Sequence, residues 1–186
     1  MLILSGIDAW SVKNIFPESP DITSSKIGQI FPGLFVGLDR DASILGLEKA
    51  GFLGYKELQS NLIKAPVRWD GHSYELSCKF NEMGKLELCL LQGESGWQDF
   101  FYEDIVRPQW LALYKRMERA YGKPVQHRDF PEFHEVPLND KGGLITSQWE
   151  LSDRTILLGL QSYIEQDCCT KQMLDFSCCI LLIQPK

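Results

Sequence analysis

Residues 74–90, YELSCKFNEMGKLELCL, carry the clearest structural pattern in the chain. Apolar side chains occupy every second position in two runs, Tyr74, Leu76, Cys78 and Phe80, then Leu86, Leu88 and Leu90. A period of two is typical of a strand with one buried face. Residues 81–84, NEMG, have the length of a hairpin turn, and Gly84 accepts the positive φ that such a turn requires. The stretch therefore predicts an antiparallel hairpin, entered through the turn at 68–71.

Residues 104–124, DIVRPQWLALYKRMERAYGKP, predict a long helix over 104–121. Apolar residues recur at helical spacing: Val106, Trp110, Leu113, Tyr114, Met117 and Tyr121. Asp104 is the expected N-cap, and Pro108 is tolerated in the first turn because no N–H donor is needed there. Gly122 stops the helix and Pro124 prevents its return.

A shorter helix is predicted over 41–51. Asp39 or Asp41 can cap its start, and Gly51 suits its end. The expected apolar face consists of Ile44, Leu45, Leu47 and Ala50.

The C-terminal part predicts three more strands. Residues 144–151 and 155–164 form an expected hairpin around the turn 152–154, with Ile156, Leu158, Leu160 and Ser162 facing inward. Residues 178–183 are continuously apolar, as in a central strand. The order of elements predicts an α+β fold, in which an antiparallel β-sheet has helices packed on one face and is built from helix-plus-hairpin units. We expect a single domain over 1–186, with residues 1–36 as an irregular N-terminal arm.

The chain has 186 residues, a hydrophobic fraction of 44% and a formal net charge of -6. This acidic balance disfavours nucleic acid and anionic membranes and favours a basic protein partner. The short apolar run at the N-terminus is not preceded by Lys or Arg, and no run reaches the ~18 apolar residues of a membrane span. The expected location is cytoplasmic.

Six cysteines are expected to be reduced thiols. Adjacent side chains in Cys168-Cys169 and Cys178-Cys179 point apart, whereas tetrahedral zinc sites use spaced ligands. No metal and no cofactor is therefore predicted.

No phosphate-binding loop, dinucleotide fingerprint, nucleophile elbow or zinc-protease motif occurs. Two alternatives for catalysis remain open. The loop of residues 127–140, with His127 at its start and Asp140 at its end, could hold a hydrolytic metal through His127, His134 and a carboxylate. Cys78 or Cys89 could pair with a histidine as a nucleophile, although buried structural cysteines are usually inert. No catalytic residue is predicted.

Four features together resemble a group of small bacterial α+β proteins that includes immunity proteins of secreted toxins. They are the Trp69-Asp70-Gly71 strand entry, the F-x-x-x-G-K-L-x-L hairpin between Phe80 and Leu90, the run YKRMERAYGKP at 114–124, and Trp149 at the next hairpin. The resemblance covers roughly residues 40–165. It implies a non-catalytic inhibitor that neutralises a cognate toxin by direct binding. A secretion chaperone or adaptor is the alternative from a different class, and it should expose apolar grooves and form a dimer.

The expected partner-binding surface consists of two acidic, loop-rich stretches. The first provides Trp97, Asp99 and Glu103, and the second provides Asp129, Glu132 and Glu135. Loops on a rigid sheet commonly carry recognition, and a tryptophan among carboxylates has the composition of a binding hot spot with a steering rim. Trp110 and Trp149 are expected in the core instead.

Overall fold

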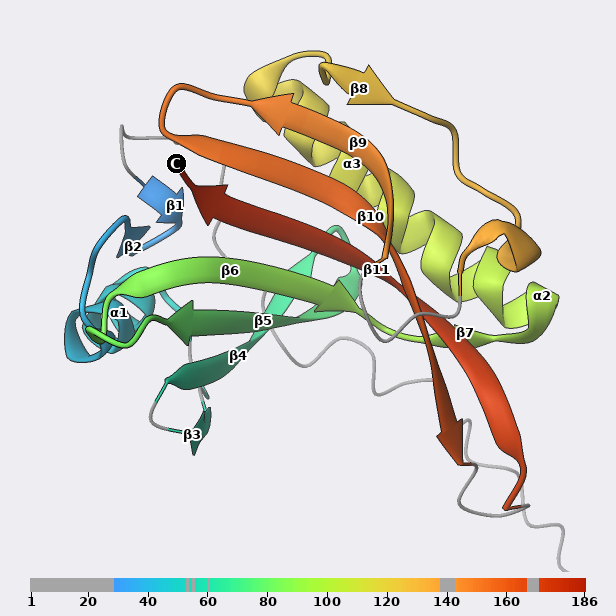
Figure 1. Cartoon of the computed structure of the whole chain (residues 1–186), viewed down its shortest axis with the longest axis horizontal. Helices are drawn as coiled ribbons and strands as arrows, with labels where there is room; N and C mark the ends of the chain where they lie inside the picture. The colour runs from blue at the N-terminus through green and yellow to red at the C-terminus, as the bar shows by residue number, and fades with distance from the viewer. Residues whose placement is uncertain (1–28, 53, 55, 60, 138–142, 167–170) are drawn as a thin grey trace, which may run out of the picture.

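The computed structural model describes residues 29–186 except 53, 55, 60, 138–142 and 167–170. Most of this part is a nine-stranded sheet whose neighbouring strands are all antiparallel, in the order β3-β4-β5-β6-β11-β10-β9-β8, with β7 paired to β11 (Figure 1). The strands are β3 (Lys56–Gln59), β4 (Leu62–Trp69), β5 (His72–Phe80), β6 (Leu86–Gly93), β7 (Gly96–Trp97), β8 (Gln126–His127), β9 (Leu144–Glu150), β10 (Arg154–Gln166) and β11 (Met173–Pro185). The α+β prediction is confirmed.

One continuous helical segment packs against this sheet. It contains α2 (Gln98–Phe101), a π-helical turn (Tyr102–Val106) and α3 (Arg107–Tyr121). In Figure 1, α3 runs along one face of the sheet behind β9, β10 and β11. Trp110, Leu113 and Met117 are buried there, as their helical spacing predicted. No helix in the described part of the chain is long and apolar enough to cross a membrane.

The predicted start of this helix was wrong. Asp104 is an exposed residue inside the segment, which begins six residues earlier at Gln98. Pro108 has no N–H to donate to the preceding turn, so it suggested a helix start. The π-turn, in which the Arg107 N–H bonds the Tyr102 carbonyl, lies directly before Pro108 and lets the helix continue through it.

The short helix predicted over 41–51 is confirmed as α1 (Arg40–Lys49), which ends two residues before the predicted end. The Asp39 carboxylate accepts a bond of 2.9 Å from the Ala42 N–H, and Gly51 has a φ of 91° just beyond the helix. Its predicted face was partly wrong, because Leu47 is buried whereas Leu45 is exposed. The helix instead approaches the turn between β1 and β2 through Gly46, whose backbone touches Gly33.

The hairpin of β5 and β6 is confirmed, with Gly84 at a φ of 69°. Its inward phase was predicted correctly for β5 and for Leu86, but not for Leu88 and Leu90, which are half-buried. The register shifts between Lys79 and Phe80. Such an irregularity reverses the facing of the residues beyond it, so Cys89 and Leu91 point into the core instead.

The three predicted C-terminal strands are confirmed, but β11 extends from Met173 to Pro185 and is longer than the predicted 178–183. β9 and β10 form the expected hairpin, and β11 lies between β6 and β10 at the centre of the sheet. Cys178 pairs with Gln161 and Cys179 pairs with Leu160, so the adjacent thiols face opposite sides of the sheet. Both are buried.

The N-terminal arm was predicted as irregular over 1–36. Residues 1–28 lie outside the described residues, but β1 (Gln29–Phe31) and β2 (Leu34–Phe35) form a two-stranded antiparallel sheet, which corrects the prediction for this part. Ile30, Phe31 and Leu34 join the core. The sequence interpretation also missed β4 as a strand.

Candidate functional site

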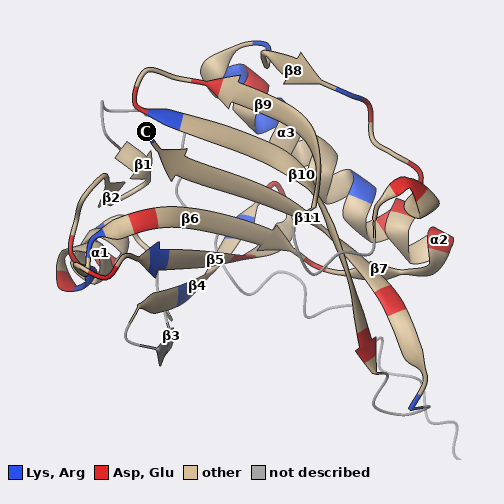
Figure 2. Cartoon of the chain, viewed as in Figure 1, with Lys and Arg blue, Asp and Glu red and all other residues tan. Residues whose placement is uncertain are grey.

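The two acidic stretches predicted to bind a partner meet at one surface cavity. The cavity has a volume of about 330 Å³ and lies between the start of the long helix and a 3₁₀ turn (Phe133–Glu135). Its lining residues are Asp99, Tyr102, Glu103, Arg107, Glu132, Phe133 and His134. Figure 2 shows acidic residues gathered around α2 and the neighbouring turn. The fold therefore joins segments that are about thirty positions apart in the sequence.

Tyr102 fixes the 3₁₀ region against the helix. Its buried hydroxyl donates to the Pro131 carbonyl over 3.0 Å, and its ring centroid lies 4.8 Å from that of Phe130 and 5.3 Å from that of Phe133. Burial and the nearby Glu103 carboxylate raise the pKa of Tyr102, so the hydroxyl keeps its proton at neutral pH. The wall of the cavity is thus held by a buried hydrogen bond and aromatic contacts.

The 3₁₀ turn is closed by a reciprocal capping box. The Glu132 N–H donates to the Glu135 carboxylate over 2.9 Å, and the Glu132 side chain accepts from the Glu135 N–H. Glu135 also lies 3.5 Å from Arg128. Glu132 lines the cavity, whereas Glu135 does not line it and has a structural role in the turn.

The cavity carries a net negative charge. Glu103 forms an ion pair of 2.6 Å with Arg107, one helical turn away, and His134 lies 3.5 Å from Glu132. Within the part of the chain that the structure describes, no ion pair is recorded for Asp99, which is exposed. Three carboxylates thus surround one guanidinium, and such a site attracts a cationic group.

Trp97 is placed differently from the prediction. It lies in β7 and not in a flexible loop, opposite Phe176 of β11, and it is half-buried with its ring stacked on Phe101 at 4.9 Å. Its neighbour Phe100 is the exposed aromatic residue, with 66% of its surface accessible. The sequence analysis missed Phe100. This residue points outward because the helix begins at Gln98, and no local sequence pattern marked that early start.

Asp129 is also separate from the cavity. It is fully exposed, and its carboxylate lies 3.8 Å from His127 Nε2. Of the six predicted residues, the fold brings Asp99, Glu103 and Glu132 together around the cavity and leaves Trp97, Asp129 and Glu135 outside its lining.

His127 was the central residue of the catalytic alternative. Its Nδ1 lies 2.9 Å from the Ser147 hydroxyl, and its ring packs on Tyr114 at 4.7 Å. The order Ser147, His127, Asp129 resembles a hydrolase triad, but the Ser147 side chain is buried and the carboxylate is in solvent. A nucleophile must reach its substrate, so the contact is better explained as anchoring β8 to β9. Asp140, the last residue of the proposed loop, lies outside the described residues.

All four described cysteines are buried, and three of them have a raised pKa. The neighbouring Cys78 thiol and burial raise the pKa of Cys89, and burial raises the pKa of Cys179. Burial also raises the pKa of Cys178 to about 11. Because the thiolate is the reactive form, these groups are largely unreactive at neutral pH. Among the described residues, no cluster of three or more His, Cys, Asp or Glu side chains could hold a metal ion.

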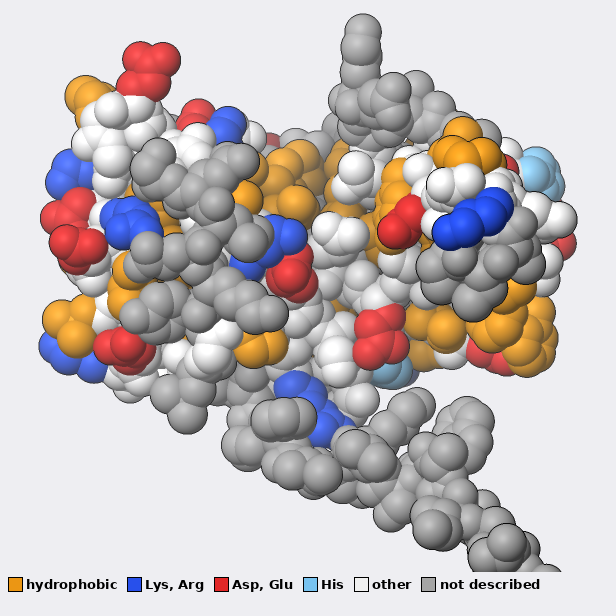
Figure 3. Space-filling model, turned by 90° about the horizontal axis from the view of Figure 1, so that it is seen from below, with side chains coloured by type: hydrophobic (Ala, Val, Ile, Leu, Met, Phe, Trp, Pro, Cys, Tyr) orange, Lys and Arg blue, Asp and Glu red, His pale blue; other side chains and the backbone are white. Residues whose placement is uncertain are grey.

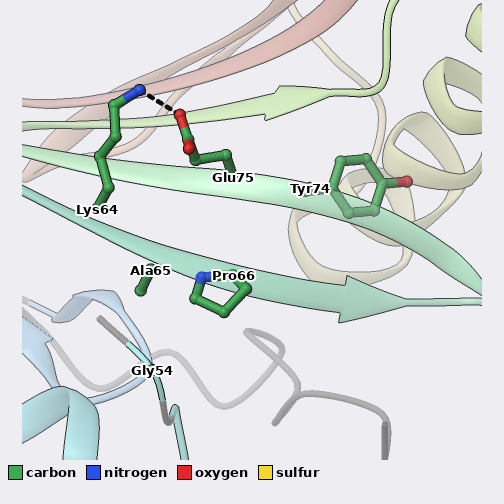
Figure 4. Close-up of a pocket in the computed structure, with 6 residues that line it drawn as sticks. All are labelled: Gly54, Lys64, Ala65, Pro66, Tyr74 and Glu75. Atoms are coloured by element: carbon green, nitrogen blue, oxygen red, sulfur yellow. Dashed lines mark hydrogen bonds and ion pairs between the residues drawn. The ribbon is translucent and has the colours of Figure 1, made fainter. Parts of the chain in front are cut away.

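A second cavity lies beside β4 and β5 and is drawn in Figure 4. It has a volume of about 190 Å³, and Lys64 and Glu75 form an ion pair at its edge. Tyr74 points away from this pair toward the helix, where its hydroxyl lies 3.3 Å from the Gln109 carbonyl. The two charges neutralise each other, so this cavity offers no free charge to a ligand. On the lower face of the described part, charged side chains of both signs are interspersed (Figure 3).

Comparisons with protein-family models, with curated proteins and with solved structures gave no match to this chain.

Proposed function

We propose that this protein is a non-catalytic inhibitor of the immunity-protein kind, which neutralises a basic toxin or effector protein by direct binding. The observation that carries the proposal is the cavity in which Asp99, Glu103 and Glu132 converge from two segments of the chain. The net charge of -6 has the sign that steers a basic protein toward this surface.

Phe100 supplies the apolar part of the proposed contact. It is exposed next to the acidic cavity, and its ring lies 5.2 Å from that of Phe101, which is itself stacked on Trp97. An exposed aromatic side chain on a regular helix presents apolar area at low entropic cost, with the carboxylates as a charged rim. We infer that Phe100 anchors the partner and that the carboxylates speed its approach.

The first experiment is coexpression with candidate basic toxins from the same organism. The inhibitor should restore growth, and the purified pair should bind with a salt-dependent association rate. Asp99→Lys and Glu132→Lys should slow association, most strongly at low salt, where screening is weakest. Glu82→Lys is the matched control, because Glu82 is an exposed acidic residue at the distant β5–β6 turn.

Phe100→Ala should act on dissociation and leave the association rate nearly unchanged. If binding to a verified partner is indifferent to Phe100→Ala and to both charge reversals, the proposed surface is misplaced. If the purified protein turns over a substrate and loses that activity on His127→Ala, the inhibitor hypothesis fails.

A secretion chaperone or adaptor is the second candidate, favoured by a groove on the outer side of α3 in which the apolar Leu111 is exposed between charged residues. Such a protein would bind unfolded segments of its client. An inhibitor binds a folded toxin, so the conformational state of the bound partner distinguishes the two functions.

A further inference from the structure

The outward side of α3 carries a groove of about 300 Å³ that is separate from the acidic cavity. Its lining residues are Asp70, Pro108, Leu111, Ala112, Lys115, Arg116 and Arg119. Leu111 is 40% exposed although its neighbours Trp110 and Leu113 are buried in the core. The groove and the acidic cavity share no lining residue.

Charge is distributed unevenly along this side of the helix. Asp104 precedes the apolar centre formed by Leu111 and Ala112, and Lys115 and Arg119 follow it. Figure 2 shows the acidic residues near α2 and basic residues along α3, and the basic residue at the start of α3, Arg107, is paired with Glu103. Arg116 is paired with Asp70 at 3.0 Å, whereas the described part of the chain has no recorded ion pair for Asp104, Lys115 or Arg119.

The positions are symmetric about the apolar centre. Asp104 lies seven residues before Leu111, and Arg119 lies seven residues after Ala112. Pro108 and Lys115 lie three residues before and after the same pair. By their i,i+3 and i,i+4 spacing, Pro108, Leu111, Ala112, Lys115 and Arg119 share one face of α3, and Asp104 lies in the π-helical turn that leads into it. A copy of this face turned by a two-fold rotation therefore meets opposite charge at both ends.

We propose that the groove is the interface of a homodimer, in which α3 packs antiparallel against α3 of a second copy of this chain. The two-fold axis passes between Leu111 and Ala112, so that Asp104 faces Arg119 of the partner subunit twice. Such an isologous contact closes on itself and gives a dimer, not a chain of subunits. The antiparallel helix dipoles add to the attraction.

The dimer is weak and reversible. Exposed ion pairs contribute at most about 1 kcal/mol each, and the apolar centre is small. The groove and the acidic cavity share no lining residue, so the dimer proposal does not depend on the proposed inhibitor function.

Sedimentation analysis of the full chain over a wide concentration range tests this proposal. The wild type should change from 21.3 kDa toward twice that mass as concentration rises. Asp104→Arg and Arg119→Asp each place like charges together twice, so each should raise the dissociation constant at least about tenfold. Leu111→Glu should do the same by charging the apolar centre, and Glu82→Arg is the control of equal charge change outside the groove.

Mixing the two single variants provides the decisive measurement. In the mixed dimer, the substituted position 104 of one chain is basic and faces the substituted position 119 of the other chain, which is acidic. The native pair remains at the second contact. An equimolar mixture of Asp104→Arg and Arg119→Asp should therefore associate at wild-type strength although neither variant does so alone. A wild type that is monomeric at all concentrations, or a dimer that is unaffected by these variants, would overturn the proposal.

Discussion

At Gly46, helix propensity and the packing of the helix against its neighbour predict opposite effects of substitution. Glycine in a helix interior is less favourable than alanine, so propensity alone predicts that Gly46→Ala stabilises α1. However, a Cβ at this position would lie 2.0 Å from the Gly33 carbonyl oxygen. That oxygen belongs to the backbone of the β1–β2 turn, which cannot move without displacing buried residues such as Phe31 and Leu34.

We expect Gly46→Ala to lower the free energy of unfolding by about 1–3 kcal/mol, the usual cost of overpacking. Leu45→Ala, at the exposed neighbouring position, should change it little. Urea denaturation of the two variants measures the difference. An increase in stability for Gly46→Ala would show that the turn does not press on the helix.

Tyr102 gives a second prediction at the residue scale. Its hydroxyl bonds the Pro131 carbonyl, so Tyr102→Phe should cost about 1 kcal/mol and loosen the wall of the acidic cavity. The raised pKa of Tyr102 adds a pH dependence. The contribution of this residue is fully present below about pH 10, the ordinary pKa of tyrosine, and is lost as the pH rises through the higher pKa of the folded state.

Denaturation curves between about pH 8 and about pH 11 test this point. The wild type should lose stability in the alkaline part of the range, and Tyr102→Phe should lose less of it. Identical slopes for the two proteins would mean that Tyr102 ionises equally well in the folded and unfolded chains.

At the scale of elements, the packing of α3 on the sheet depends on Trp110. This side chain is buried, and its Nε1 donates to the Thr146 hydroxyl of β9 over 2.8 Å. Trp110→Ala should lower the free energy of unfolding by about 3–5 kcal/mol. Phe100→Ala is the matched control, because it removes an aromatic ring from an exposed position of the same helical segment. Equal denaturation midpoints for both variants would refute the burial of Trp110.

At one end, β10 and β11 pair mainly with each other and form a two-stranded ribbon. We therefore expect the local stability of these two strands to differ along their length. Among the described residues, β9 pairs with β10 only up to Leu160, and β6 pairs with β11 only from Ile180 onward. Beyond these points β10 and β11 pair with each other, with β7 adding only two partners, and the ribbon projects from the sheet in Figure 1. A two-stranded ribbon is marginally stable by itself.

Hydrogen exchange should therefore be at least about tenfold faster for the amides of 164–166 and 173–175 than for those of 156–160 and 180–183. Native-state exchange followed by mass spectrometry or NMR resolves the two groups. Uniform protection along both strands would indicate that something further covers the ribbon.

Features that depend on neighbouring residues were predicted correctly from the sequence, whereas features that depend on long-range contacts were missed or wrong. The β5–β6 turn, the cap at Asp39 and the stop at Gly122 depend on neighbouring residues and were predicted correctly. The inward facing of Leu88 was predicted wrongly because a register shift at the hairpin leaves no mark in the alternation itself. β4 was missed although its residues alternate. It contains Pro66, a residue uncommon inside strands, but β3 reaches only to Lys64, so Pro66 lies where pairing on that side has ended.

The candidate site was also predicted only as far as local sequence allowed. Acidic, loop-rich segments were recognisable from composition, but their meeting at one cavity depends on the contact of Tyr102 with Pro131 across the fold. No local pattern could separate Glu132, which faces the cavity, from Glu135, which closes the turn.

At the scale of the whole molecule, the buried thiols provide a measure of global opening. Cys78 and Cys89 are cross-strand partners in the core, and Cys178 and Cys179 lie buried on opposite faces of the central strand β11. Their burial and, where the pKa is raised, their protonation both slow modification. Each thiol must wait for an opening that separates strands from the sheet.

A variant carrying Cys168→Ser and Cys169→Ser isolates these four thiols. In native buffer this variant should react with a thiol reagent only at the rate at which the sheet opens. As denaturant is added, all four thiols should become reactive together, at the unfolding midpoint measured by fluorescence. Central strands open with the free energy of global unfolding. If the opened sheet closes faster than the reagent modifies a thiol, the reaction rate follows the population of the open form. Trp110→Ala should therefore accelerate the reaction in native buffer in proportion to the stability that this variant loses. Rapid reaction of any one thiol in the native protein would show that its strand opens separately, and would place the weakest part of the sheet at that residue.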